Sequence, residues 1–522
     1  MINQESISRK LPSYADVMHE AFDFNGGLNT HAAGFFIDQE SLYALRKNQF
    51  TLGTNLIRAK NGLLQTRPGR VKVNNTPVTP PAGDATIRSM YELRRSDGTD
   101  RICMNAGNTF YRLNGSTWTS VGTFVTANLR RSYCQFKEVL LGVDGTNDMM
   151  KYDGTTLSAI AAAPKGKAMA AFRDRVWIIN GKTLSYSAQG DETDWVTPNN
   201  AGAIPVPVSQ GTGGTALIPM WDRLIILCGQ QVFQMSGTGP SSFAITPINL
   251  AYGNAMSCYG PSPAGNDIYF GDSRGIHGLS HTEAQNLLGD VSYNYISGIV
   301  ESEWQKITAG NLPNSFTLHD KTNNLVLFIF SSQSNNNSMA LVADYYHLDE
   351  RNMPTWTFYS NMPFASGAEV VSLSGTSELL FGDYNGTVYK QSNIVATDDG
   401  ANVPVTFKYL TDLGLPQFTK LLRHIMFFTE ASEGLVTVSV SFDYGAHVMT
   451  RSFDATSAAG GVLGTTFIIG QSSLGSSTFK KTRLGMPGHG RFLEMQLTYS
   501  GTSRFTLGGF IMFAGARRLI NV

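Results

Sequence analysis

The sequence predicts an all-β protein: a β-propeller of about seven blades, with a β-sandwich-like platform built from the N-terminal arm and the C-terminal strands. Three observations predict this fold class. A short strand phrase recurs along the middle of the chain, the strands after residue 395 are longer and alternate with period two, and charged residues make up only 15% of a chain with 53 glycines. Helix-period segments are scarce, which favours a turn-rich β protein.

The recurring phrase is an Asp-Arg pair followed by an apolar run. It occurs at Asp100-Arg101, Asp174-Arg175 and Asp222-Arg223, each with a glycine seven residues after the aspartate and an apolar residue ten after it. Weaker copies begin at Glu138, Asn266, Asn324 and Glu378. A polar pair, a β-rich run, a glycine turn and a returning run together predict a β-hairpin. Units of about 40–50 residues with four short strands are typical of propeller blades.

Two further segments are expected to be the outer hairpins of blades. Residues 111–118 contain Asn114-Gly115 and residues 152–157 contain Asp153-Gly154, and such pairs supply the positive φ angles of a tight turn. Dividing residues 85–395 by a blade of about 45 residues gives about seven blades, and six or eight would also fit.

We divide the chain into three parts. Residues 1–84 form the N-terminal arm and platform strands, residues 85–395 the propeller, and residues 396–522 the C-terminal β-sandwich platform. The Pro- and Gly-rich segment 74–83 is expected to be a linker. In the third part, period-two alternation predicts six strands, at residues 403–410, 420–430, 435–444, 479–483, 491–500 and 505–514.

The charges balance, with 40 basic and 40 acidic residues. Without net charge, no long-range field draws the chain to nucleic acid or to an anionic membrane, so contact with DNA has to be local or geometric. The first 20 residues do not resemble a secretory signal and no run is apolar enough to span a bilayer, so we expect synthesis in the cytoplasm without general export. The cysteines lack metal- or disulfide-like spacing and are expected to be reduced core residues: Cys103, Cys134, Cys228 and Cys258.

No catalytic residue, metal site or cofactor is expected. His277 and His281 have the i, i+4 spacing of zinc ligands, but the glycines around them are incompatible with a helix. Gly211-Thr212-Gly213-Gly214 lacks the lysine and helix of a phosphate-binding loop, and a flexible loop is expected. A glycosidase needs two carboxylates at a set distance from each other, and the sequence does not give that distance for the three neighbouring carboxylates that could supply such a pair. These are Asp344, Asp349 and Glu350.

Two groups of charged residues are candidates for contacts. The Asp-Arg pairs of the blade phrase are expected to be structural, as blade-to-blade salt bridges or turn caps. The basic clusters are candidates for contacts with a channel lumen or a neighbouring subunit, with a solvated face as the alternative. Their members are Arg94, Arg95, Arg130, Arg131, Lys165, Lys167, Lys480, Lys481 and Arg483.

Short motifs in all three parts follow a common order. The arm contains Phe24-Asn25-Gly26-Gly27-Leu28-Asn29-Thr30, Asn55-Leu56-Ile57-Arg58 and Leu64-Gln65-Thr66-Arg67-Pro68-Gly69. The propeller contains Tyr259-Gly260-Pro261 and Arg274-Gly275-Ile276-His277-Gly278-Leu279, and the last part contains Lys420-Leu421-Leu422-Arg423, Phe442-Asp443-Tyr444-Gly445 and Gly515-Ala516-Arg517-Arg518. In this order the motifs resemble the tail nozzle, or packaged-DNA stabilisation, proteins of short-tailed (podovirus-type) bacteriophages.

The resemblance implies a structural protein of the virion tail, without enzymatic activity. Proteins of this family form a hexameric ring beneath the portal and its adaptor, retain packaged double-stranded DNA and provide the channel for its ejection. The implied partners are further copies of the chain, the portal-adaptor protein, tail fibre or tailspike proteins, and DNA without sequence specificity. A ring that lets DNA pass should not grip it, because each neutralised phosphate adds affinity.

Two other classes of function stay open. A propeller glycosidase or depolymerase would attack the host surface with converging acids, and a propeller binding module would recognise a host glycan without hydrolysis. A binding module is expected to cluster exposed aromatic residues on one face. Trp118, Trp177 and Trp195 are instead expected in blade cores.

Overall fold

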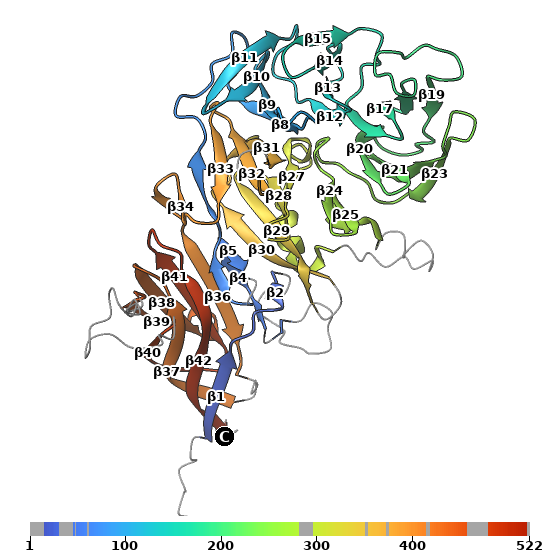
Figure 1. Ribbon diagram of the computed structural model, residues 1–522. Helices are drawn as coiled ribbons and strands as arrows, with labels where there is room; N and C mark the ends of the chain where they lie inside the picture. The colour runs from blue at the N-terminus through green and yellow to red at the C-terminus, as the bar shows by residue number, and fades with distance from the viewer. Residues whose placement is uncertain are drawn as a thin grey trace, which may run out of the picture. The chain divides into compact units, whose positions relative to one another are not determined.

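The structure is a computed structural model that describes residues 15–30, 45–46, 48–59, 62–280, 296–332, 334–349, 353–371, 375–413, 418–456 and 479–518. The chain divides into two compact units, Pro68–Ile394 and the pair of segments Met1–Arg67 and Val395–Val522. Both units are built almost entirely of strands (Figure 1). Within the described ranges, no helix has the length and apolar character needed to cross a membrane.

The unit Pro68–Ile394 is a β-propeller whose described strands form seven antiparallel blades. The first blade is β8 (Ile87–Leu93), β9 (Arg101–Ala106), β10 (Thr109–Asn114) and β11 (Thr117–Thr123), and the second is β12 (Ser132–Phe136), β13 (Val139–Val143), β14 (Met149–Tyr152) and β15 (Leu157–Ile160). The third blade is β16 (Ala168–Phe172), β17 (Arg175–Asn180), β18 (Thr183–Tyr186) and β19 (Gly202–Pro205). The fourth blade is β20 (Gly214–Met220), β21 (Arg223–Cys228), β22 (Val232–Ser236) and β23 (Ala244–Asn249).

The fifth blade has three described strands, β24 (Ser262–Ala264), β25 (Asp267–Gly271) and β26 (Ile276–Gly278). The short helices η1 (Gly298–Val300), α2 (Glu301–Trp304) and η2 (Leu312–Asn314) follow it. The sixth blade is β27 (Phe316–Asp320), β28 (Leu325–Phe330), β29 (Met339–Leu348) and β30 (Pro354–Ser360), and the seventh begins with β31 (Phe364–Val370), β32 (Glu378–Asp383) and β33 (Val388–Ser392).

The seventh blade is completed by a strand from the beginning of the unit. β7 (Gly69–Lys72) pairs antiparallel with β33, with Lys72 opposite Tyr389 and Gly69 opposite Ser392. This pairing joins the two ends of the unit and closes the ring. The propeller unit therefore starts at Pro68, whereas the sequence-based division places its start after residue 84.

The residues expected to be a linker also lie against this blade. The Asn74 side chain accepts a hydrogen bond from the Val388 backbone N–H and donates one to the Gly386 carbonyl. The Val78 N–H donates to the same carbonyl. Segment 74–83 is thus anchored along the edge of the seventh blade and is not a free connection.

The recurring phrase marks the second strand of every blade. Arg101, Arg175 and Arg223 are the first residues of β9, β17 and β21. The weaker copies coincide with the second strands of the other four blades, β13, β25, β28 and β32. The two predicted outer hairpins are β10–β11 and β14–β15, which confirms that the phrase and the turn pairs mark blade positions.

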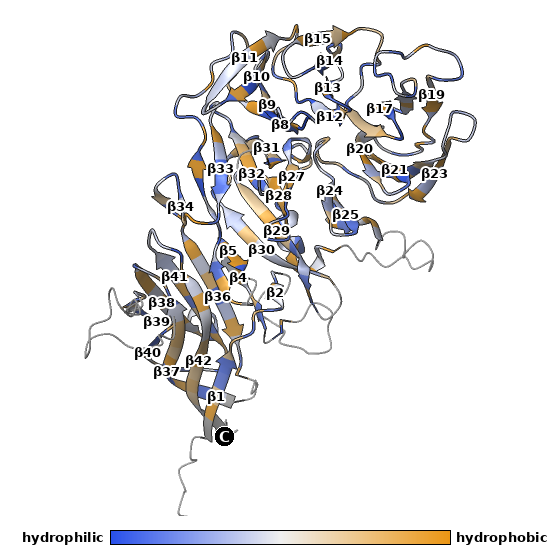
Figure 2. Cartoon of the chain, viewed as in Figure 1, coloured by the Kyte–Doolittle hydropathy of each residue, from blue (hydrophilic) through white to orange (hydrophobic). Residues whose placement is uncertain are grey.

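The propeller core lies between neighbouring blades. Second strands are buried on both faces, as in β28, where all six residues are buried. One apolar cluster joins the third and fourth blades around Trp177 and Phe233, and similar clusters join other adjacent pairs. Continuous apolar runs such as Leu325–Phe330 form strands here because both sheet faces are covered. Figure 2 shows these apolar residues in orange along the blade strands.

The second unit is a β-sandwich. Its first sheet contains β1 (Ala15–Ala21), β5 (Leu56–Arg58), β6 (Leu64–Thr66), β37 (Phe418–Glu430), β40 (Lys480–Gly490) and β42 (Thr506–Arg518). Its second sheet contains β4 (Leu52–Thr54), β36 (Val405–Thr411), β38 (Leu435–Phe442), β39 (His447–Asp454) and β41 (Leu493–Ser500). Smaller elements are the parallel pair β2 (Gly27–Leu28) and β3 (Gln49–Phe50), the hairpin β34 (Thr397–Asp398) and β35 (Ala401–Asn402), and η3 (Asp443–Gly445).

Aromatic residues pack the two sheets of the sandwich together. Phe510 of β42 contacts Phe407 and Tyr409 of β36, with ring centroids 6.4 and 5.0 Å apart. Alternate residues of β38 point into this core, and Val436, Val438, Val440 and Phe442 are fully buried. Both the arm and the C-terminal strands therefore contribute to the sandwich, as predicted.

A buried ion pair fixes the arm within this unit. The Arg67 guanidinium donates two hydrogen bonds to the Asp398 carboxylate, at 3.0 and 2.7 Å, and both side chains are almost fully buried. Removing one partner of such a pair leaves a buried charge without compensation, so the two residues stabilise this arrangement jointly. Arg67 belongs to the Leu64–Gly69 motif of the arm.

Candidate functional site

The innermost strands of the propeller surround a cavity of about 550 Å³. All seven inner strands line it, with Glu92 on β8, Tyr133 on β12, Met169 on β16, Leu217 on β20, Ser262 on β24, His319 on β27 and Glu369 on β31. This is the central space of the propeller, and it is far too small for a DNA duplex.

Two side chains cross the axis of the propeller and close this space. Arg130, which precedes β12, donates hydrogen bonds to the Ser257 hydroxyl and to the Ala365 carbonyl, both at 2.9 Å. The Tyr259 hydroxyl donates to the Arg131 carbonyl at 2.8 Å. These contacts connect the second blade with the segments that enter the fifth and seventh blades. The propeller axis is therefore no passage for a polymer.

Of the two arginines predicted as lumen or subunit contacts at this point, Arg131 is buried and Arg130 is half-buried. Arg131 is buried, its guanidinium lies 2.5 Å from the Asp144 carboxylate, and it stacks 3.3 Å from the centre of the Phe124 ring. Burial lowers the pKa of Arg130 and of Arg131, although an arginine stays charged at neutral pH. The prediction that Arg131 contacts a lumen or a neighbour is wrong, because its charge is already neutralised inside the blade.

The other predicted basic residues of the propeller lie at its surface. Arg94 is 2.7 Å from Glu92, Arg95 is 3.7 Å from Glu138, and Lys165 is 3.1 Å from Asp148. Glu92 is buried, whereas both partners of the other two pairs are at least partly exposed, and such exposed pairs contribute little to stability. Lys167 is exposed and lines a second cavity, described below.

The Asp-Arg pairs hold turns and connections of the blades. Arg175 is buried and donates hydrogen bonds to the Ser187 carbonyl at 2.8 Å and to the Asn200 side chain at 3.1 Å. Arg223 donates to the Gln234 side chain on the neighbouring strand β22 at 2.6 Å, and Arg101 to the Asp100 carbonyl at 3.1 Å.

The aspartates of these pairs have different partners. The Asp100 carboxylate accepts a hydrogen bond from the Arg95 N–H at 2.9 Å, across the turn before β9. Asp174 lies 4.0 Å from Lys137, and the Asp222 carbonyl accepts from Arg173 at 2.8 Å, both across neighbouring blades. The pairs thus make turn caps and contacts between blades.

A second cavity of the propeller, larger than the central one, has a volume of about 1070 Å³ and lies at the end where second strands turn into third strands. Gly181, Gly229 and Asp272 come from such turns in the third, fourth and fifth blades. Antiparallel topology places the connections between blades at the same end, and Gln210–Thr215 and Ala255–Cys258 supply them.

Glycine residues bring the backbone close together in the wall of this cavity. A Cβ atom on Gly213 would lie 2.2 Å from the Gly181 carbonyl oxygen, and one on Gly229 would lie 2.2 Å from the Thr212 hydroxyl. The Gly214 N–H donates a hydrogen bond to the Gly181 carbonyl at 2.8 Å. Residues 211–213 form a loop, as predicted, and Gly214 begins β20; the predicted flexibility does not fit the tight packing of Gly213 against the turn of the neighbouring blade.

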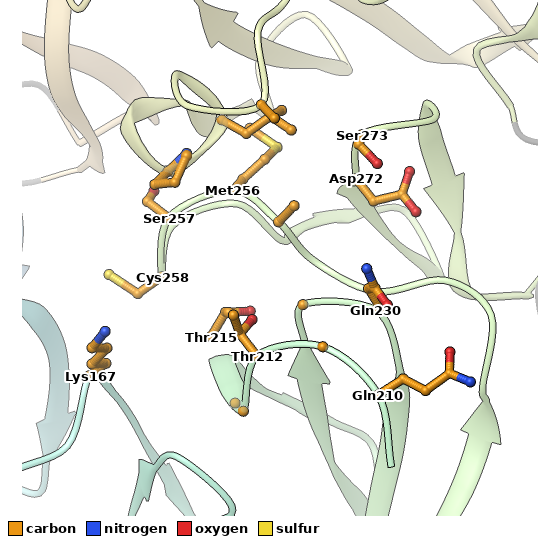
Figure 3. Close-up of a pocket in the computed structure, with 18 of the residues that line it drawn as sticks. Lys167, Gln210, Thr212, Thr215, Gln230, Met256, Ser257, Cys258, Asp272 and Ser273 are labelled. Atoms are coloured by element: carbon orange, nitrogen blue, oxygen red, sulfur yellow. The ribbon is translucent and has the colours of Figure 1, made fainter. Parts of the chain in front are cut away.

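Polar side chains from separate segments surround this cavity. Figure 3 shows Gln210, Thr212, Gln230 and Ser273 as sticks, together with Lys167 from the segment before β16. These five side chains and that of Asn180 are exposed, and none of the six makes a hydrogen bond or ion pair to another side chain in the part of the chain that the structure describes. Their donors and acceptors are available to a ligand.

The two carboxylates that line the cavity are held by other groups. Asp144 accepts hydrogen bonds from Arg131 and from the backbone N–H groups of Thr146 and Asn147. Asp272 is buried, and although burial raises its pKa, hydrogen bonds from His277 and Arg274 outweigh this effect and lower the pKa below the usual range. A lowered pKa does not suit Asp272 to act as a general acid, which needs a raised pKa.

The residues weighed for other chemistry have structural contacts. His277 is buried, bonds to Asp272 at 3.1 Å and stacks on Tyr252, while His281 and Glu350 lie outside the described residues. Asp344 accepts hydrogen bonds from the Tyr346 and His347 N–H groups and from the His347 ring. Within the described ranges, no three His, Cys, Asp or Glu side chains are grouped to hold a metal ion.

The four cysteines are free thiols. Cys103, Cys134 and Cys228 are buried, and burial raises the pKa of each to about 12. Burial also raises the pKa of Cys258 to about 11. The thiols therefore stay protonated at neutral pH and are poor nucleophiles and metal ligands.

The sandwich presents an outward-facing apolar surface on its first sheet. Side chains of β1, β42, β37 and β40 form three cross-strand rows, which we call the platform face: Met18, Phe513 and His424; Glu20, Ile511, Met426 and Arg483; and Phe22, Phe428 and Lys481. Met18 and Phe22 are 58% and 43% exposed. Sequence reasoning found Lys481 and Arg483, but not the apolar residues beside them.

Ring contacts hold the platform face in a fixed arrangement. Phe22 reaches over Gly509 to Phe428, with ring centroids 5.1 Å apart, and Lys481 lies 5.8 Å from the centre of the Phe428 ring. Arg483 donates to the His424 ring at 3.2 Å. Lys480 points elsewhere and donates to the Asp454 carbonyl at 2.7 Å.

Comparison with known proteins gives likeness only at the level of solved structures. No family model and no curated protein sequence matches the chain. The Neurospora crassa Pan2 WD40 domain has a TM-score of 0.39 and 10% identity, over 62% of this chain and 94% of that domain. The computationally designed Ika8 protein has a TM-score of 0.34 and 8% identity, over 60% and 98%.

A third solved structure, PorZ, is described as an essential bacterial surface component of the type-IX secretion system of Porphyromonas gingivalis. Its TM-score is 0.36 and its identity 12%, over 73% of this chain and 46% of that one. These scores carry no argument about function. The assignment of a seven-bladed propeller depends on the strand pairing and on the β7–β33 closure.

Proposed function

We propose that this chain is a structural, non-enzymatic protein of a phage tail that assembles into a ring and leaves a channel for double-stranded DNA between its copies. The observation that carries the proposal is the platform face. Six apolar side chains, those of Met18, Phe22, Met426, Phe428, Ile511 and Phe513, gather on the outward side of one sheet. Contiguous apolar surface of this kind is typical of a contact with another protein.

The basic residues on this face fit the same role. Lys481 and Arg483 lie at the edge strand β40, beside the apolar rows. A contact with apolar residues in the middle and charged residues at the rim is typical of subunit interfaces. The resemblance of the arm and the C-terminal motifs to nozzle proteins agrees with a platform that is built from the same segments.

The centre of the propeller is not the DNA path in this proposal. Arg130 and Tyr259 cross the axis, and the central space holds only about 550 Å³. DNA would therefore pass between neighbouring copies, with the propellers around it. The zero net charge of the chain suits a conduit, because few phosphate contacts have to be broken as DNA moves.

The carboxylates of the larger cavity support a non-enzymatic role. Asp144 and Asp272 are both engaged in several hydrogen bonds, and the pKa of Asp272 is lowered. A glycosidase needs two carboxylates that face one bond, one of them with a raised pKa. Turnover of host polysaccharide by the purified chain would contradict this part of the proposal.

Native mass spectrometry with negative-stain class averages tests the ring, with the chain alone and after mixing with the portal-adaptor protein. We expect six copies in a closed ring, around a channel about as wide as a duplex. The double variant Phe22→Ser with Phe428→Ser should stay folded and monomeric. Leu435→Ser replaces a residue of similar exposure, 48%, on the other sheet and should still assemble. A wild-type monomer under both conditions would refute the ring.

A further inference from the structure

We propose that the 1070 Å³ cavity of the propeller binds an acidic oligosaccharide. This binding function goes beyond the ring and does not depend on it, because every residue that lines the cavity belongs to the propeller unit. It also involves no hydrolysis. The ligand class follows from the chemistry of the lining, its charge and its size.

The free side chains match the hydroxyl groups of sugars. Three of them are carboxamides, on Asn180, Gln210 and Gln230, and two are hydroxyls, on Thr212 and Ser273. A carboxamide offers donors and an acceptor side by side, and a hydroxyl offers both roles on one atom. Sugar hydroxyls also donate and accept, so this set can satisfy several of them at once.

The charge of the lining points to an acidic sugar. Lys167 is the one lining cation for which the described residues provide no carboxylate or hydrogen-bond partner. Arg274 is bonded to Asp272, and Arg130 is bonded to Ser257 and two carbonyls. The carboxylates of Asp144 and Asp272 are paired with Arg131 and Arg274. A ligand carboxylate therefore meets the free ammonium group of Lys167. A polyphosphate, in contrast, requires several free cations or arginine forks.

The size and shape favour a chain of sugars over a single one. Ligand sites for small molecules are about 300–1,000 Å³, and this cavity has about 1070 Å³. Leu250, which is 53% exposed, adds an apolar contact for the face of a sugar ring. The binding free energy therefore comes mainly from polar groups spread over an extended surface.

The wall of the cavity is preorganised. Gly213 cannot accept a Cβ atom without displacing the Gly181 carbonyl, and the loop is tied to the neighbouring blade by the Gly214–Gly181 hydrogen bond. Side chains carried on such fixed backbone lose less conformational entropy on binding than those on a free loop. Gln210 and Thr212 flank Gly211 in this loop, and Gln230 lies against it.

The test is binding of defined oligosaccharides to the full chain, by isothermal titration calorimetry. The probes are hexa-galacturonate, an α2,8-linked tetramer of sialic acid and neutral maltohexaose, followed by an array of acidic bacterial surface glycans. We expect at least one acidic glycan to bind, and maltohexaose to bind at least tenfold more weakly. Lys167→Met should weaken the acidic glycan at least tenfold, and Gln230→Ala severalfold.

Lys165→Met is the matched control, because Lys165 is an exposed lysine two residues away that does not line the cavity. It should leave affinity unchanged. If no acidic glycan binds, or if Lys165→Met weakens binding as much as Lys167→Met, the proposal is overturned. Mass spectrometry of Lys167→Met gives the second readout: its assembly should equal that of the unmodified chain, so a failure here is distinguishable from a failure of the ring.

Discussion

The two sheets of the sandwich share one core but present different outer surfaces. The first sheet has the platform face, with aromatic and aliphatic residues in three cross-strand rows. The second sheet has three rows of mostly polar residues, which we call the hydroxyl face: Thr406, Thr498, Thr437 and Ser452; Lys408, Gln496, Ser439 and Thr450; and Leu410, Glu494, Ser441 and Val448.

The two outer surfaces separate the features that the fold requires from those that it does not require. Both sheets need apolar residues on the inner side, and both have them. Nothing in the packing of the sandwich requires apolar residues on an outer side, where period-two alternation normally places polar residues. The hydroxyl face follows the normal pattern and the platform face departs from it, so the departure needs another reason, which we take to be contact between copies.

The largest expected effect comes from removing what the two sheets share. Phe510 is fully buried and contacts Phe24, Phe407, Tyr409 and Phe427. Phe510→Ala should lower the free energy of unfolding by about 3–5 kcal/mol, because a cavity replaces the ring. Chemical denaturation measures this loss. A loss below about 1 kcal/mol would mean that the sheets do not depend on a common core.

A smaller effect is expected from single changes on the platform face, and it should appear in association. Phe22→Ser should weaken association between copies by about 2 kcal/mol, or roughly 30-fold, if Phe22 is a central contact. Its effect on unfolding should stay within about 0.5 kcal/mol, since the ring is 43% exposed. Sedimentation velocity over a concentration series measures the association. Equal effects from Phe22→Ser and Leu435→Ser would remove the distinction between the two faces.

The strands of the propeller were predicted more completely from the sequence than those of the sandwich. The blade phrase located all seven second strands because those strands are apolar on both faces and begin at equivalent turns. Strand β39 was missed, since His447–Asp454 is an exposed edge strand with only one buried residue and no clear alternation. The closure by β7 depends on pairing between Gly69 and Ser392, which local patterns cannot indicate.

The candidate sites were less predictable than the fold. The larger cavity joins segments between Arg130 and Pro313, and only the ring of blades brings them together. Lys167 was singled out as basic, but the carboxamides around it carry no local pattern. The close approach of Gly181 and Gly213 marks the wall of the cavity, but it is visible only in the structure. The part of the platform face on β37 and β42 could have been found by comparing the two sides of the predicted strands at residues 420–430 and 505–514, but no strand was predicted around Met18 and Phe22.

The sheets also differ in how they hold a lysine, which gives a dependence on pH. Lys420 of β37 is buried and donates to the Arg491 carbonyl at 2.6 Å, whereas Lys408 of β36 is partly exposed and 3.4 Å from Glu494. Burial lowers the pKa of Lys420 from 10.5 to about 8, against the opposite influence of Asp412. The unfolded chain then binds more protons than the folded one between pH 8 and 10.5, so this lysine makes stability rise with pH in that window.

The rise should be about 3 kcal/mol and should be absent in Lys420→Met. The measurement is denaturant unfolding at several pH values from 7.5 to about 10.5. Lys408→Met is the control and should keep the same profile as the unmodified chain. If Lys420→Met also keeps it, Lys420 is not the titrating group.

The smallest effect is expected on the hydroxyl face. Thr450 donates to the Ser439 hydroxyl at 3.2 Å in an exposed cross-strand pair, so Thr450→Ala should cost only a few tenths of a kcal/mol. Thermal unfolding of the isolated chain should barely change, and the mass of the assembly should not change. A clear loss of assembly in Thr450→Ala would mean that the hydroxyl face is also covered by a neighbouring copy. The ring would then join unlike faces, platform to hydroxyl, because head-to-tail contacts are what close a cyclic assembly.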